Sequence, residues 1–231
     1  MTNTKEINIL TFADVLEMQR KVVQWNKLFG INPTDKEYIP LYKSLSDEEF
    51  FGDSEFLESW NKKCEEGQLD GAADLSFTTF QWAVLDDNCI DPADECWFEG
   101  IGADSDITPY IEGLGKELER GDSFASQTEL LHILKRLSTK YNVKAAFDRV
   151  CESNYSKAVH KDKNVDIRAE IDYITSKGRY ADITAEESGD YIIFKAGMDV
   201  ESGVVFDKKK VIKSRQFVDI PELGGLLEFK Y

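Results

Sequence analysis

The chain has 231 residues, 42% of them hydrophobic, which suffices for one core of ordinary domain size or two small ones. Lysine and arginine number 28 and aspartate and glutamate 44, so the net charge is −16 and the average field repels a phosphate backbone. No stretch approaches the roughly 20 apolar residues that cross a bilayer, and no apolar signal region follows the first residues. We therefore expect no nucleic acid polymer and no membrane among the partners, and a cytoplasmic location.

Apolar residues at helical spacing predict three helices in the first 85 residues. The first covers residues 12–29, between a capping box at Thr11 and Asp14 and a stop at Gly30. A second is expected over residues 38–63, with Gly52 as a point where it could split into two. The third, residues 69–85, is apolar on more than half of its circumference, which predicts a central helix.

The second half of the chain changes character twice. Residues 87–125 carry eleven acidic side chains and five glycines, which predicts an irregular, solvated insertion. A capping box at Ser126 to Glu129 then opens a fourth helix, and Asn142 caps a fifth. Finally, residues 191–194 and 203–206 follow a period of two and are expected to form a β-hairpin.

Paired carboxylates on helical faces are the strongest chemical signal. Asp70 and Asp74 are four residues apart on the apolar third helix, where a carboxylate pair is costly unless a cation compensates it. Glu49 and Asp53 have the same spacing on the second helix, with Glu48 beside them. Two facing helices with such pairs would form an oxygen-rich cage that suits Mg²⁺.

This arrangement resembles a known family. An acidic pair on one helix, followed after about 17 residues by Asp70-Gly-Ala-Ala-Asp74-Leu, is similar to the all-α nucleoside triphosphate pyrophosphohydrolases, the MazG-like superfamily, in a form common among phages. Ser153-Asn-Tyr-Ser-Lys157 resembles the end of a family helix, and residues 210–221 resemble the family's tail, where Lys-Val-hydrophobic-Lys precedes an aromatic residue and a proline. The resemblance covers residues 12–85, 143–160 and 207–223.

The resemblance implies a fold and an activity. The fold would be all-α: a bundle of about five helices with an appended C-terminal β-hairpin, forming one domain over residues 1–231 with insertions at about 87–125 and 162–206. The activity would convert a nucleoside or deoxynucleoside triphosphate to the monophosphate and pyrophosphate with Mg²⁺. The expected site residues are Glu48 and Glu49 as catalytic groups, Glu49, Asp53, Asp70 and Asp74 as metal ligands, and Asn154, Lys157, Lys210 and Lys213 as substrate-binding groups. A homodimer or homotetramer is expected, in the host cytoplasm if a phage encodes the chain.

One position departs from the family pattern. The second helix of the family usually has Glu-Glu-x-x-Glu, and Gly52 occupies the last position here. Asp53 could substitute, Glu55 and Glu58 could supply the ligands in a shifted register, or metal binding could be lost; the spacing to Asp70 favours Asp53.

The alternative functions are a non-catalytic nucleotide-binding or protein-interaction protein on the same scaffold, and an acidic decoy that mimics DNA.

Overall fold

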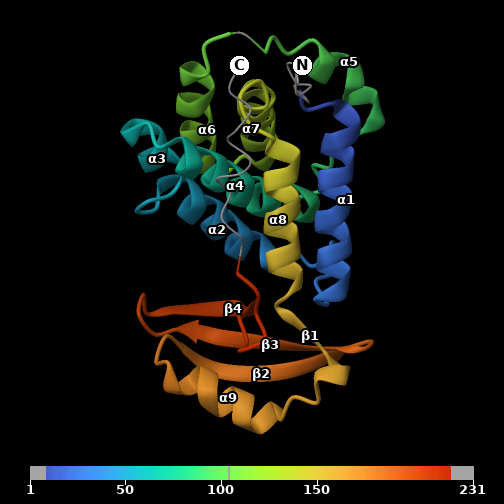
Figure 1. Cartoon of the computed structure of the whole chain (residues 1–231), viewed down its shortest axis with the longest axis vertical. Coiled ribbons are helices and arrows are strands. Elements are labelled where there is room, and N and C mark those ends of the chain that lie inside the picture. Colours follow the sequence, from blue (N-terminus) through green and yellow to red (C-terminus); the bar gives the residue numbers. More distant parts are fainter. Residues whose placement is uncertain (1–8, 104, 220–231) are drawn as a thin grey trace, which may run out of the picture.

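A computed structural model describes residues 9–103 and 105–219 as a helical layer stacked on an antiparallel sheet (Figure 1). The α-helices are α1 (Phe12–Leu28), α2 (Ile39–Phe51), α3 (Phe56–Lys62), α4 (Glu65–Leu85), α5 (Glu95–Glu99), α6 (Thr108–Arg120), α7 (Ser123–Leu137), α8 (Val143–Tyr155) and α9 (Ile167–Ser176). The strands are β1 (Ala158–His160), β2 (Tyr180–Ser188), β3 (Tyr191–Asp199) and β4 (Val204–Val211). Short 3₁₀ turns are η1 (Lys36–Tyr38), η2 (Pro92–Asp94) and η3 (Lys161–Lys163).

The expected all-α bundle of about five helices with an appended hairpin is wrong, because the fold is mixed. Within the described residues, β3 pairs antiparallel with β1, β2 and β4 and so forms the centre of a four-stranded sheet. The predicted hairpin is present as β3 and β4, whose pairing brings Asp199 opposite Val204. It is one part of a sheet that separates the helical layer from α9 (Figure 1).

The two faces of β3 bury apolar side chains in two different cores. Ile192, Phe194 and Ala196 belong to a small cluster that includes Ile174 of α9, while Ile193 joins the large core of the helical layer. Successive side chains of a strand point to opposite faces, so covering both faces produces a continuous apolar run instead of an alternating one. The sheet therefore forms a buried middle layer.

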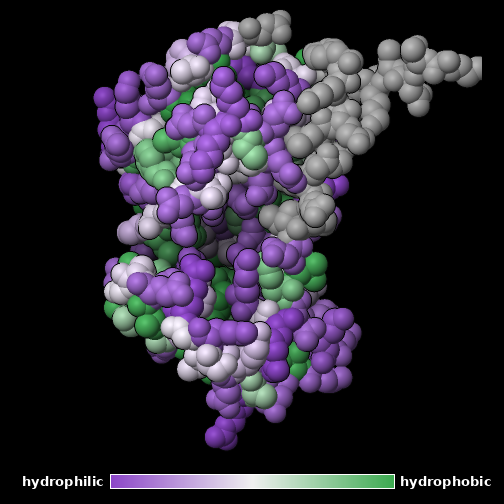
Figure 2. All heavy atoms as spheres, turned by 60° about the vertical axis from the view of Figure 1, so that its left-hand side comes forward, coloured by the Kyte–Doolittle hydropathy of each residue, from purple (hydrophilic) through white to green (hydrophobic). Residues whose placement is uncertain are grey.

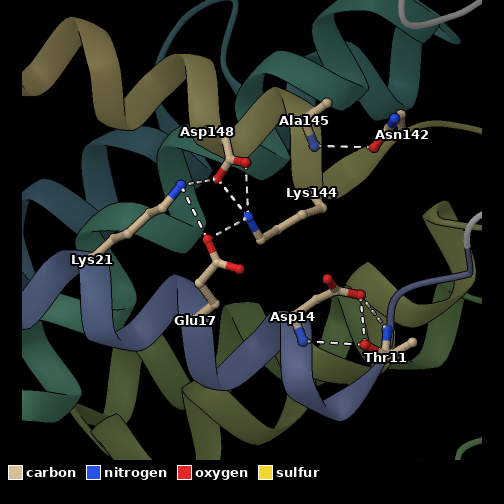
Figure 3. Close-up of polar contacts among 8 residues, drawn as sticks. All are labelled: Thr11, Asp14, Glu17, Lys21, Asn142, Lys144, Ala145 and Asp148. Carbon is tan, nitrogen blue, oxygen red and sulfur yellow. Dashed lines mark hydrogen bonds and ion pairs between the residues drawn. The ribbon is translucent and has the colours of Figure 1, made fainter.

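The helices predicted from the first 85 residues are largely confirmed. Helix α4 packs against α1, α2, α3, α7 and α8 and is buried on almost every side, as a central helix should be. The second predicted helix is divided at Gly52 into α2 and α3. Both ends of the capping box on α1 are formed, since the Thr11 side chain accepts from the Asp14 backbone and Asp14 from the Thr11 backbone (Figure 3).

Helices α1 and α8 are joined by a network of charges (Figure 3). The Lys21 Nζ lies 2.8 Å from Asp148 Oδ1, and the Lys144 Nζ lies 2.8 Å from Asp148 Oδ1 and 3.3 Å from Glu17 Oε1. All four side chains are partly exposed, so each pair contributes only about 0–1 kcal/mol to stability. The main consequence is geometric, because the network aligns two helices that both contribute to the site below.

Residues 87–125 are not the irregular insertion that their composition predicts. They contain α5 and α6, and α6 buries Ile111, Leu114 and Leu118. These three residues are spaced three and four apart, and they form one apolar stripe that faces α7 while the acids lie toward solvent. The prediction is wrong because a narrow stripe in a strongly acidic segment has low average hydrophobicity.

The start of α7 also differs from the prediction of a cap at Ser126. The helix begins at Ser123, and the Asp122 side chain accepts a hydrogen bond of 2.9 Å from the Ala125 backbone. Ser126 lies inside the first turn, fully buried, with no hydrogen-bond partner for its Oγ within the described part of the chain.

Substitution by alanine should therefore have different effects on stability at Asp122 and at Ser126. Asp122→Ala removes the cap and is expected to lower the free energy of unfolding by about 1 kcal/mol. Ser126→Ala deletes an unpaired buried hydroxyl and is expected to be neutral or slightly stabilising. Urea denaturation of both variants measures the difference, and a larger loss for Ser126→Ala would contradict the observed helix start.

Candidate functional site

A cavity of about 680 Å³ lies where the helical layer meets the sheet. Its lining comes from α1, α2, α4 and α8 above and from β2, β4 and the chain that follows β4 below. Figure 2 shows a hollow at this boundary, with hydrophilic and apolar residues in its walls. Segments distant in the sequence thus contribute to one site.

The helical wall of the cavity is acidic. Among the acidic residues that line the cavity, Glu48 and Glu49 belong to α2, Asp70 and Asp74 belong to α4, and Glu55 is the residue directly before α3. Four of the predicted residues, Glu48, Glu49, Asp70 and Asp74, are thereby brought together. Asp53 is exposed and does not line the cavity, so the structure places Glu55 where the sequence spacing favours Asp53.

Gly52 explains why Glu55 reaches the cavity. The chain leaves α2 at Gly52 in an extended conformation and turns through Ser54, whose φ is +69°. A Cβ atom at position 52 would lie 2.5 Å from the Glu48 carbonyl oxygen and 2.9 Å from Glu55 Cγ. The glycine therefore creates the space in which Glu55 folds back toward α2, while Asp53 remains on the outside of the turn.

A second close approach holds the start of α3 against α4. A Cβ atom at Gly71 would lie 2.8 Å from both Cα and N of Phe56, so the two backbones pack at a distance that only glycine allows. Phe56 follows Glu55 directly and is fully buried. This contact fixes Glu55 beside the Asp70 and Asp74 side of α4.

The crowded carboxyl groups have raised pKa values. Burial is the main cause, assisted by neighbouring acids: it raises the pKa of Glu49 to about 8 and that of Asp74 to about 7. Burial also raises the pKa of Glu55 and of Asp70, and Glu49 and Glu55 are within hydrogen-bonding reach. Near neutral pH the carboxyl groups of this wall therefore hold a proton, which reduces their negative charge. A bound cation could compensate the same charge in place of the proton.

The opposite wall of the cavity is basic. It contains Lys157, which follows α8, Lys210 of β4, Lys213, and Arg179, which directly precedes β2. Burial, with Lys213 and Lys210 close by, lowers the pKa of Lys157 to about 8, although Asp74 and Glu49 oppose the shift. The pKa of Lys210 is lowered by burial too. All three predicted lysines thus face the predicted carboxylates across one cavity.

Asn154 also lines the cavity, as expected, and its side chain is tied to the basic wall. The Lys157 Nζ donates a hydrogen bond of 2.5 Å to Asn154 Oδ1. Asn154 is in the last turn of α8, so the two residues are three positions apart at a helix end. This leaves the amide nitrogen of Asn154 as a donor beside an ammonium group.

Residues 212–219, called the strap below, cross from the sheet back to the helical layer. The buried carboxylate of Glu170 on α9 accepts hydrogen bonds of 2.6 and 2.7 Å from the Arg215 backbone and guanidinium. Further along, the Val218 backbone nitrogen donates to Ser156 Oγ at 2.9 Å, and Ser153 Oγ donates to the Val218 carbonyl at 3.0 Å. These contacts of the strap hold Lys213 at the cavity.

The arrangement does not contain a preformed metal centre. Across residues 9–103 and 105–219, no group of three or more histidine, cysteine, aspartate or glutamate side chains could hold a metal ion as it stands. The carboxylates nevertheless supply hard oxygen donors, which are the donors that Mg²⁺ uses. This wall can therefore contribute ligands, but water or a bound substrate would have to complete the coordination.

Several residues that line the cavity escaped prediction. Tyr42, Glu66 and Gln81 lie within the part of the chain that the resemblance covers, but no family motif marks them, whereas Arg179 and Tyr180 lie in a segment that the resemblance does not cover. The sequence signal of the last two is weak: a glycine and an arginine before a strand whose residues are mostly half-exposed.

Among the described helices, none has the length and apolar character needed to cross a membrane. Comparisons with family models, curated proteins and solved structures find no match to this chain.

Proposed function

We propose that the chain is a Mg²⁺-dependent nucleoside triphosphate pyrophosphohydrolase that releases the monophosphate and pyrophosphate. The observation that carries the proposal is the pairing of an acidic wall with a basic wall across one cavity. A triphosphate bridged by a divalent cation presents both charges at once: the cation suits the carboxylates, and the phosphate oxygens suit the lysines. The resemblance of the acidic motifs to the MazG-like superfamily points to the same substrate class.

The residues present are compatible with Mg²⁺. This ion often binds proteins through only one or two carboxylates and completes its coordination with water and substrate phosphates. The raised pKa values of Glu49 and Asp74 are a second sign, because Lys157 compensates the charge of these acids only in part, and they retain protons that a cation would displace. Glu49, Glu55, Asp70 and Asp74 are the ligands that we propose, with Glu55 in place of Asp53.

Each wall would have a separate task. When bound, Mg²⁺ would neutralise phosphate charge and lower the pKa of a coordinated water. Glu48 is exposed at the edge of the acidic wall and could accept a proton from the attacking water. Lys157, Lys210 and Lys213 would bind phosphate oxygens, and Asn154 would donate to the sugar or the first phosphate. The homodimer or homotetramer stays a prediction.

A second candidate is a non-catalytic nucleotide-binding protein. It is favoured by one observation, namely that no group of side chains in the described part of the chain is already arranged as a metal site. In that case the lysines would bind the phosphates, and the acids would remain partly protonated. The two candidates differ in one property, turnover that depends on Mg²⁺.

We expect the purified protein to release pyrophosphate and a nucleoside monophosphate in equal amounts from at least one common nucleoside or deoxynucleoside triphosphate. The release should require Mg²⁺ and stop when EDTA removes the metal, because the phosphate charge is then no longer neutralised. A coupled pyrophosphate assay across the eight common substrates measures this. Tight nucleotide binding without turnover of any substrate would support the second candidate instead.

A further inference from the structure

The cavity has a second end that the acidic and basic walls do not explain. Along α4, Asp74 and Gln81 line the cavity seven residues apart, and along α2 Glu49 and Tyr42 line it at the same separation. With a rise of 1.5 Å per residue, both helices therefore change from acidic to uncharged lining over about 10 Å. Phosphates and metal belong to one end, and the other end must accept something uncharged.

Aromatic side chains line this second end. Trp25 and Phe77 are almost fully buried, and their rings meet edge to face with centroids 5.5 Å apart. The Trp25 indole nitrogen donates a hydrogen bond of 3.2 Å to the Asn154 carbonyl, which connects this end to the residue beside Lys157. The Trp25 ring is also stacked on Phe29, with centroids 4.1 Å apart, so this end of the cavity borders a cluster of aromatic rings that can pack against the face or the edge of an aromatic ligand.

A chain of polar side chains crosses the aromatic end. Gln81 lines the cavity with only 1% of its surface exposed, and its Nε2 donates a hydrogen bond of 3.0 Å to Asn26 Oδ1. Gln81 is also hydrogen-bonded to the Tyr42 side chain, which is buried and lines the cavity as well. Two amides and a hydroxyl are thus assembled in an otherwise apolar region.

This polar chain is incomplete. Asn26 is fully buried, and its Nδ2 has no hydrogen-bond partner among the described residues. A buried donor without a partner is costly and uncommon, so groups of this kind are usually completed by water or a ligand. The unpaired donor belongs to Asn26, which does not line the cavity itself but is hydrogen-bonded to Gln81, which does.

We infer that the aromatic end is a nucleobase site in which Gln81, supported by Asn26 and Tyr42, reads the hydrogen-bonding edge of the base. A primary amide presents a hydrogen-bond donor beside an acceptor. It can therefore pair with a base edge that carries an acceptor beside a donor. The separation of about 10 Å along both helices leaves room for a pentose and its first phosphate between base and metal. The inference extends the proposed function, because it assigns the part of the substrate that distinguishes one nucleotide from another.

Gln81→Met tests the inference, since methionine keeps the length and approximate volume of glutamine but removes both hydrogen-bonding groups. We expect the dissociation constants of AMP, CMP, GMP and UMP to differ in the unchanged protein, and the largest preference to fall about five- to 100-fold in Gln81→Met. Tripolyphosphate, which has no base, should bind equally to both proteins. Isothermal titration without metal measures all five ligands, and thermal unfolding verifies that the variant is folded.

Tyr42→Phe provides a second variant in case Gln81→Met does not fold, because it removes only the hydroxyl and should weaken the same preference by a smaller factor. Preferences that are unchanged in the folded variants, or monophosphates that bind no better than inorganic phosphate, would overturn the inference. These measurements do not depend on catalysis. If base preference depends on Gln81 but no triphosphate is hydrolysed, the proposed hydrolase fails and the nucleobase site stands.

Discussion

Replacing Asp74 with asparagine is expected to reduce Mg²⁺-dependent turnover by more than about 100-fold while leaving the fold intact. The change removes a negative charge from the most enclosed part of the acidic wall and alters almost no volume. Loss of residues that merely support metal ligands already lowers affinity or activity by about 10–100-fold, and a ligand should matter more. Pyrophosphate release at saturating Mg²⁺ measures the effect, and near-normal activity would place the metal elsewhere.

The same substitution should stabilise the metal-free protein at alkaline pH. Asp74 and Glu49 have folded-state pKa values of about 7 and about 8, above their ordinary values, so the folded state holds protons more tightly than the unfolded state. The contribution of these two groups to the free energy of unfolding therefore falls as the pH rises from about 4 to 8. The asparagine side chain cannot ionise, so Asp74→Asn should show a shallower fall and a higher melting temperature at pH 8. An identical pH dependence of melting in both proteins would contradict the raised pKa of Asp74.

A matched pair of variants distinguishes the two candidate residues on the turn after α2. Asp53→Asn changes an exposed side chain outside the cavity and should leave turnover near normal. Glu55→Gln changes a side chain that lines the cavity and should reduce turnover at least tenfold, with a higher Mg²⁺ requirement. The reverse result would identify Asp53, the residue that the sequence spacing favours, as the metal ligand in place of Glu55.

The difference between Asp53 and Glu55 shows where sequence reasoning about the site reached its limit. Spacing along one helix assumes that the helix continues, and under that assumption Asp53 lies on the same face as Glu49. The helix instead ends at Phe51, and the extended conformation of Gly52 turns Asp53 outward. The sequence did identify the facing pair Asp70 and Asp74, because α4 runs uninterrupted through both.

The same contrast applies to the fold. Helices α1 and α4 were predictable because local caps and long apolar patterns specify them without reference to other segments. Helix α9 carried a local signal that was overlooked, since Asp166 caps it and Ile167, Ile171 and Ile174 follow helical spacing. Strand β2 was missed because its residues are largely half-exposed, and what defines it is pairing with β3. Long-range contacts of this kind leave little local pattern. The mixed fold, and with it the sheet-derived wall of the cavity, could not be read from periodicity.

Lys157→Ala is expected to raise KM for the nucleotide by about 10- to 150-fold, which corresponds to the roughly 1.5–3 kcal/mol of a hydrogen bond to a charged group. Lys157 lines the cavity between the carboxylates and the other lysines, so a phosphate group there would contact its ammonium directly. Lys209→Ala is the matched control. Lys209 is the neighbour of Lys210, but its Nζ lies 2.9 Å from Asp182 and it does not line the cavity, so KM should stay within about twofold.

The pH dependence of kcat/KM separates a phosphate contact at Lys157 from a structural one. Because the pKa of Lys157 is lowered to about 8, the free enzyme loses this positive charge as the pH rises above 8, and kcat/KM should decline on that side. The decline should disappear in Lys157→Ala, whereas Lys209→Ala should retain it. An alkaline limb that persists unchanged in Lys157→Ala would assign it to another group and reduce Lys157 to a partner of Asn154 at the end of α8.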